Sequence, residues 1–115
     1  MATRTPTIEI IGERCVRATW SGLLNGDVGA PVEWPAYMDR SVQVTGTFGA
    51  GGSVSIDGSN DGVNFVPLSN PRGNALAMAS ASLEQIEDCA YKMRPSVTAG
   101  DGTTNLVVTL FARKA

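Results

Sequence analysis

Apolar and polar residues alternate with a period of two along most of this sequence, and apolar residues almost never recur at helical spacing. In an extended chain, Val16, Ala18 and Trp20 fall on one face and the intervening Arg17 and Thr19 on the other. This alternation is typical of a strand with one face in a core and one in solvent. Because it returns repeatedly, the sequence predicts an all-β protein.

Further alternating runs are rich in β-branched residues and are separated by Gly, Asn, Asp and Pro. They cover residues 7–11, 41–47, 53–56, 63–68, 89–94 and 105–112. The glycine-rich turns at 49–52 and 99–102 each predict a hairpin between the runs that flank them. The last run is apolar on both faces, which predicts a strand in the centre of a sheet or inside an assembly.

The sequence does not decide the secondary structure of two segments. Residues 75–81 fit a weak strand or a short helix, and residues 82–88 fit one helical turn or a plain loop. With about seven or eight strands, the pattern predicts an antiparallel β-sandwich or a jelly-roll-like barrel. The length of 115 residues predicts one domain, 1–115, with a short N-terminal arm.

The longest predicted loop, residues 21–40, is unusually apolar for a connection. Glycine and proline interrupt it, yet it contains Trp34, Tyr37 and Met38. One interpretation is that it folds over an open end of the core. The other is that it presents its aromatic residues to a partner, as interface hot spots often do.

The charge distribution excludes some partners. The net charge of −2 provides no broad positive surface for nucleic acid, and no apolar run is long enough to span a membrane. The N-terminus lacks the pattern of a signal peptide, which predicts a protein kept in the cytosol. Arg4, Arg14 and Arg17 lie near one end, and Glu84, Glu87 and Asp88 form an acidic cluster. Scattered solvated charge is the simplest interpretation of both groups.

Catalytic chemistry has little support in the sequence. There is no histidine, so the commonest general base and most zinc sites are missing, and we expect no enzyme, metal or cofactor. Asp57, Ser59, Asp61 and Gly62 copy the start of a calcium-binding loop, but Leu68 stands where a bidentate carboxylate is required. A turn is therefore expected there, with a weak cation site as the alternative.

Two cysteines, Cys15 and Cys89, are too few for a disulfide framework. In a reducing compartment each is expected to be a small core residue. A bridge between facing strands is the alternative.

The run Val-Ser-Ile-Asp-Gly-Ser-Asn-Asp-Gly-Val-Asn-Phe-Val-Pro-Leu at 54–68 resembles small structural proteins of tailed-bacteriophage virions. The run Tyr-Lys-Met-Arg-Pro-Ser-Val at 91–97 and the final Val/Thr/Leu strand extend the resemblance to about the last two thirds of the chain. Size and β-rich composition are most similar to capsid decoration or cement proteins. A Ser-Asn-Asp-Gly turn before an aromatic residue also occurs in discoidin-like carbohydrate-binding sandwiches.

The resemblance implies a virion protein on the capsid surface, assembled in the host cytoplasm, whose partner is the major capsid protein and which has no catalytic residues. The expected contacts are Trp34, Tyr37 and Met38, with Arg4, Arg14 and Arg17 facing an acidic capsid surface. For so small and weakly charged a chain we also expect a homo-oligomer. The alternatives are a carbohydrate-binding sandwich on a virion appendage, which an exposed Phe65 would favour, and a head-tail connector or tail component.

Overall fold

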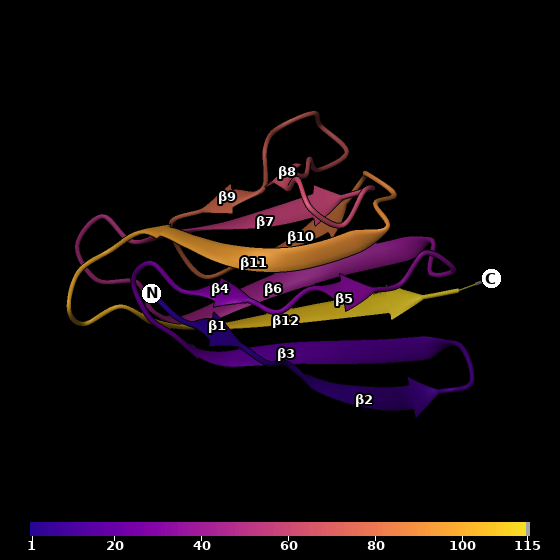
Figure 1. Ribbon diagram of the computed structural model, residues 1–115, viewed down its shortest axis with the longest axis horizontal. Coiled ribbons are helices and arrows are strands. Elements are labelled where there is room, and N and C mark those ends of the chain that lie inside the picture. Colours follow the sequence, from indigo (N-terminus) through magenta and orange to yellow (C-terminus); the bar gives the residue numbers. More distant parts are fainter. Residues whose placement is uncertain (115) are drawn as a thin grey trace.

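The computed structural model describes residues 1–114 as two β-sheets packed face to face (Figure 1). The front sheet has the strand order β1-β4-β11-β7-β8, with β5 also paired to β11 and β9 to β7. The back sheet has the order β10-β6-β12-β3-β2. Every regular element of these residues is a strand, and no helix capable of crossing a membrane occurs among them. The predicted all-β sandwich class is confirmed.

Seven strands contain five or more residues, which fits the expected seven or eight. They are β2 (Thr7–Gly12), β3 (Cys15–Leu23), β6 (Asp39–Thr47), β7 (Ser53–Ser59), β10 (Ser82–Ile86), β11 (Lys92–Ala99) and β12 (Asn105–Arg113). Five further strands have two residues each, too short for an alternating pattern to reveal. They are β1 (Thr3–Arg4), β4 (Val28–Gly29), β5 (Val32–Glu33), β8 (Val66–Pro67) and β9 (Ala77–Met78).

The core lies between the two sheets and is formed by alternate residues of the long strands. The side chains of Trp20 and Leu106 from the back sheet and Ile56 and Met93 from the front sheet are almost completely buried. The indole Nε1 of Trp20 donates a hydrogen bond of 3.0 Å to the carbonyl oxygen of Ala30, so its one polar atom is satisfied inside the core. As predicted, β12 occupies the centre of its sheet, between β6 and β3.

Both predicted glycine-turn hairpins are wrong. β6 and β7 lie in different sheets, and so do β11 and β12. In each case the glycine-rich turn carries the chain across the sandwich, and the strands pair with partners distant in sequence. Period-two alternation shows which side chains face the core, but it is the same whether the next strand pairs alongside or lies opposite.

The two segments whose secondary structure the sequence leaves undecided, 75–81 and 82–88, both contain a strand. Residues 75–81 include the short strand β9, paired with β7. The helical turn or loop expected at 82–88 is wrong, because residues 82–86 form β10 at the edge of the back sheet, paired with β6. Burial of Ile86 and ladder hydrogen bonds to β6 outweigh the weak local capping signal.

The long loop expected at 21–40 is also partly wrong. Its first residues complete β3, its last residues begin β6, and β4 and β5 lie between them as short strands of the front sheet. The N-terminal arm is ordered rather than free, because β1 pairs in parallel with β4. The chain then leaves the front sheet at Pro6 and enters the back sheet as β2.

Neither cysteine is a fully buried core residue. Cys15 is half-buried and Cys89 is exposed, and both thiols are free, so the alternative of a bridge is also wrong. The expectation of two small core residues fails because Cys15 is the first residue of β3 and Cys89 lies in the connection between β10 and β11.

Candidate interaction surface

The edge strand β2 is exposed along its whole length although it contains three isoleucines. Ile8 pairs with Ala18 and Ile10 with Val16 in the adjacent strand β3. Directly opposed residues in a ladder share a face, and Ala18 and Val16 are buried, so Ile8 and Ile10 lie on the core-facing side of the back sheet. Nevertheless 54% of Ile8 and 81% of Ile10 remains exposed.

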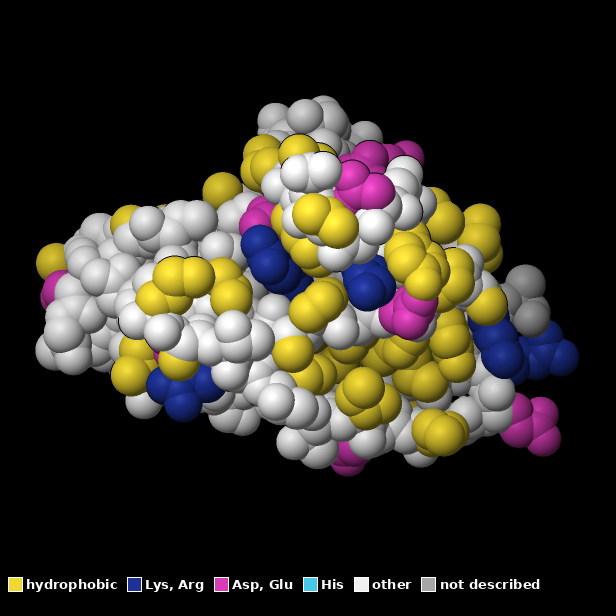
Figure 2. Space-filling view, in the orientation of Figure 1, with side chains coloured by type: hydrophobic (Ala, Val, Ile, Leu, Met, Phe, Trp, Pro, Cys, Tyr) yellow, Lys and Arg dark blue, Asp and Glu magenta, His cyan; other side chains and the backbone are white. Residues whose placement is uncertain are grey.

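These isoleucines are uncovered because the front sheet does not reach over β2. On this side the front sheet ends with three two-residue strands, and Figure 1 shows β2 extending beyond them. β2 pairs only with β3, so its outer edge has unpaired backbone N–H and C=O groups. Figure 2 shows hydrophobic side chains gathering on this face between β5 and β2. We call Ile8, Ile10 and the free edge of β2 the open edge.

The expected contact residues Trp34, Tyr37 and Met38 differ in how far the fold buries them. Trp34 is only 8% exposed and belongs to the core, and Tyr37 packs partly buried against it, with ring centroids 5.8 Å apart. Met38 is 64% exposed. The interpretation in which this segment covers an end of the core therefore holds for Trp34 and Tyr37, and little of the Trp34 side chain is accessible to a partner.

The expected basic contacts are mostly paired within the protein. Nε of Arg4 lies 3.0 Å from Oδ2 of Asp27, and Nε of Arg17 lies 3.1 Å from Oε1 of Glu9. Arg14 is exposed in the turn between β2 and β3, without an ion pair to any described residue. Only Arg14 of the three is a free charge for an acidic partner.

Asp27 joins the N-terminal arm to the body of the protein. Its buried carboxylate accepts hydrogen bonds from the backbone N–H groups of Ala2 and Leu24 as well as from Arg4. Burial alone would raise the pKa of Asp27, but the N–H of Leu24, the guanidinium of Arg4 and the N–H of Ala2 outweigh it and lower the pKa. This anchoring fixes the N-terminal arm, which leads into β2 at Thr7.

The turn that resembles a calcium loop is self-satisfied. The carboxylate of Asp61 accepts hydrogen bonds from the backbone N–H groups of Asn64 and Val63, from the amide of Asn64 and from the hydroxyl of Ser59. These bonds hold the pKa of Asp61 well below its usual range. Residues 1–114 contain no group of three potential metal ligands, so the turn interpretation is preferred over a cation site.

Phe65 follows this turn and is half-buried rather than displayed. The guanidinium carbon of Arg94 lies 3.9 Å from the centre of its ring. One face of the ring is therefore occupied by a side chain of the protein itself. That arrangement gives no support to a sugar-stacking platform, for which an open aromatic face is required.

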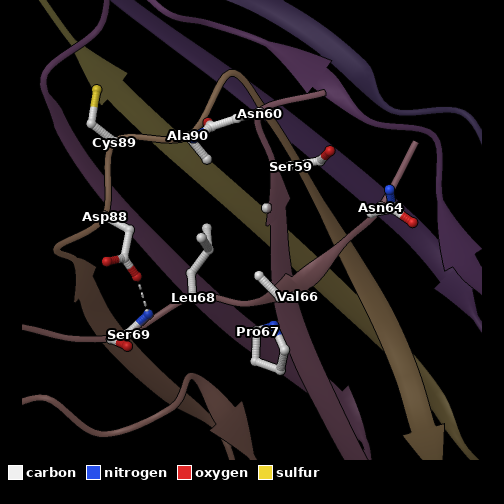
Figure 3. A pocket seen from close by; sticks show the side chains of 11 residues that line it. Ser59, Asn60, Asn64, Val66, Pro67, Leu68, Ser69, Asp88, Cys89 and Ala90 are labelled. Carbon is white, nitrogen blue, oxygen red and sulfur yellow. Dashed lines mark hydrogen bonds between the residues drawn. The ribbon is translucent and has the colours of Figure 1, made fainter. Parts of the chain in front are cut away.

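A depression of about 460 Å³ lies between β8 and the segment that precedes β11 (Figure 3). Leu68 and Ala90 contribute apolar surface to it, and the Cys89 side chain points away from Leu68. Asp88 also lines the depression, and its carboxylate accepts a hydrogen bond of 2.6 Å from the backbone N–H of Ser69. The polar groups tie neighbouring segments together and do not converge on one point, so we find no catalytic arrangement in this depression.

Sequence reasoning missed the open edge. The alternation at 7–11 puts Ile8 and Ile10 on one face of a strand, which is their correct orientation, but no local signal shows where the opposite sheet ends. Leu83 on β10 and Val63 and Val66 near β8 are further exposed apolar residues, distributed over other parts of the surface.

Neither a protein-family model nor a curated protein sequence matches this chain. Among solved structures, the fold is similar to that of the SPBc2 prophage-derived protein YomS, with a TM-score of 0.64 and 10% identity over 90% of this chain and 98% of the other. It is also similar to a cupin domain from Bordetella pertussis Tohama I, with a TM-score of 0.55 and 16% identity over 99% of this chain and 96% of the other. At these identities the likeness shows a shared β-sandwich fold alone.

Proposed function

We propose that this protein is a non-enzymatic structural component of a tailed-phage virion, a decoration or cement protein that binds the outer capsid shell and stabilises it. Its partner is the major capsid protein. The observation that carries the proposal is the open edge, where a strand presents core-type isoleucines and unpaired backbone groups to solvent.

An exposed apolar edge of this kind is a hazard for a free protein and is usually blunted by charge, proline or a covering segment. β2 contains a single charged residue, Glu9, whose carboxylate is already paired with Arg17. Strand addition by a capsid segment would satisfy the free backbone groups and cover Ile8 and Ile10 together. A partner that occupies this edge would explain why apolar side chains and free backbone groups are exposed there.

The origin of one structural neighbour supports a phage context. YomS is described as derived from a prophage, and nearly its whole length overlays this chain. The resemblance of residues 54–68 and 91–97 to small virion proteins points in the same direction. Within that context, exposed Met38 and Arg14 are the remaining expected contacts that the fold leaves free.

The test is a sedimentation assay with capsids that lack this protein. Wild-type protein and a variant carrying Ile8→Thr and Ile10→Thr are mixed with shells, and the bound copies are counted. Threonine keeps the strand propensity of β2 but removes apolar contact area. The matched control carries Val63→Thr and Val66→Thr, which changes two other largely exposed apolar residues outside the open edge.

Saturable binding at many copies per shell, weakened by the isoleucine changes and not by the valine changes, is the expected result. Binding that is confined to a single small ring at one vertex would instead favour the head-tail connector. Absence of binding to any shell would reject the decoration role.

A further inference from the structure

The outer face of β11 carries two basic residues that form no ion pair with any residue the structure describes. Lys92 and Arg94 are two positions apart on one strand, so their side chains share a face. Met93 and Pro95 on either side of Arg94 are buried, which places Lys92 and Arg94 on the face away from the core. Both residues are half-buried rather than fully extended into solvent.

The side chain of Arg94 has no hydrogen-bond or ion-pair partner among residues 1–114. Neither it nor Lys92 forms an ion pair with any described residue, whereas Arg4, Arg17 and Arg113 are each paired with a carboxylate. Within residues 1–114, Nε of Arg94 is the one buried side-chain nitrogen or oxygen without a hydrogen-bond partner. Such an orphaned group in a folded protein calls for an explanation.

Stacking on Phe65 holds the guanidinium of Arg94 in place. The separation of 3.9 Å between the guanidinium carbon and the ring centre is that of a close cation–π contact. Stacking removes water from one side of the guanidinium without using any of its N–H donors. The terminal nitrogens of Arg94 therefore remain available on a group that is already ordered.

The acids nearest in the strand ladder do not neutralise this pair by direct contact. Asp57 lies opposite Arg94 and Glu33 opposite Lys92, yet neither acid forms an ion pair with a described residue. The carboxylate of Asp57 instead accepts a hydrogen bond of 2.6 Å from the hydroxyl of Ser55. An incoming carboxylate would meet donors that are not already occupied.

We propose that Arg94, assisted by Lys92, binds a carboxylate of an acidic segment in a partner protein. The planar fork of an arginine matches a carboxylate through two parallel hydrogen bonds, and a fork fixed by stacking loses little entropy on binding. Lys92 adds a second positive charge beside it. This site is separate from the open edge, and its test does not depend on the capsid proposal.

An acidic protein segment fits this site better than an acidic sugar. One face of the Phe65 ring, on which a sugar would stack, is already occupied by Arg94. Figure 2 shows basic side chains over the front sheet, above the hydrophobic area that extends toward β2. A partner that covers this face would therefore meet positive charge and apolar surface together, which is the composition of a protein interface.

The experiment is a titration of the isotope-labelled full chain with an acetylated, amidated tetraglutamate peptide, followed by amide and arginine side-chain NMR signals. The variants are Arg94→Gln, Lys92→Gln and Asp57→Asn. The matched control is Arg72→Gln, which removes an exposed arginine from a different turn. A parallel titration uses a dimeric uronic acid, which offers the same carboxylate on a sugar.

The expected result is a saturable shift of the β11 and β7 amides and of the Arg94 Nε–H signal. Arg94→Gln should weaken the affinity about tenfold, because a charge-assisted hydrogen-bond pair is lost. Lys92→Gln should weaken it less, and Asp57→Asn should strengthen it by removing a competing negative charge. Arg72→Gln should leave it unchanged.

Equal weakening by Arg72→Gln and Arg94→Gln would show non-specific attraction and overturn the proposal. Binding of the uronic acid but not of the peptide would overturn the protein partner and assign the site to an acidic glycan. A spectrum that does not respond to either probe would also reject it.

Discussion

The buried guanidinium of Arg40 donates a hydrogen bond of 2.9 Å from Nη2 to the carbonyl oxygen of Trp34. Its other nitrogens donate to the carbonyl oxygens of Tyr37, at 2.6 Å, and Ala90, at 3.2 Å. None of the ion pairs among the described residues includes Arg40, so its charge is met by neutral acceptors, which are backbone carbonyl oxygens and the sulfur atoms of Met93 and Cys89. One side chain thereby ties the segment after β5 to the segment before β11.

Replacing Arg40 with methionine should lower the free energy of unfolding by on the order of 3 kcal/mol, because several buried carbonyl groups lose their donor at once. Chemical denaturation of the purified protein measures the change. Arg113→Met is the control, since Arg113 forms an exposed ion pair with Asp39 and should cost below about 1 kcal/mol. Equal losses in the two variants would contradict the role assigned to Arg40.

Trp34→Ala should destabilise the protein by roughly 3–5 kcal/mol, because it empties a buried site in the core. Met38→Ala, four positions later but exposed, should change the stability by less than about 0.5 kcal/mol. Thermal unfolding of both variants decides the point. A Trp34 variant as stable as wild type would return this residue to the list of surface contacts.

Acidification should destabilise the fold. Hydrogen bonds from the N–H of Ala50 and from the hydroxyl and N–H of Thr103 lower the pKa of Asp101 from 3.8 to about 2. The lowered pKa means that the unfolded chain binds this proton more readily, so the contribution of Asp101 to stability is complete above about pH 3.8 and is lost as the pH falls toward 2. Asp27 and Asp61, whose pKa values are also lowered, act in the same direction.

Denaturant titrations at successive pH values from 6 to 2 measure this loss, with Asp101→Asn as the comparison. Above pH 4 the variant should be less stable than wild type, because the amide accepts the same hydrogen bonds more weakly. Below that pH its stability should fall less steeply. Parallel pH curves for the two proteins would show that Asp101 does not contribute to acid sensitivity.

Gly58→Ala should destabilise the protein by about 1–3 kcal/mol through overpacking. A Cβ at this position would lie 2.4 Å from Cδ2 of Leu68 and 2.8 Å from Cβ of Ala90, both of which are buried. Gly102→Ala is the control, because a Cβ there meets no atom within 4 Å. Differential scanning calorimetry of both variants should show a lower unfolding temperature for the first alone.

The class of fold follows from the sequence because side-chain orientation along a strand is a local property. The alternation of Val16, Ala18 and Trp20 is sufficient to place these residues in a core whichever strand lies beside them. The same reasoning gives the turn at Asp61, whose hydrogen bonds extend no further than three residues along the chain.

The candidate sites could not be derived in this way. Ile8 and Ile10 carry the same pattern as core residues, and they are exposed only because the opposite sheet ends before it reaches them. Arg94 and Phe65 meet because the turn after β7 folds back beside β11, the neighbouring strand of the front sheet.

An all-β chain and the inward orientation of its core residues depend on local periodicity and turn chemistry, so they can be predicted from the amino-acid order. Which strands pair, which apolar residues stay uncovered and which charges remain unpaired become known only from the folded protein. Those properties depend on the relative extent of two sheets whose strands are brought together from distant parts of the chain, so no window of the sequence contains them.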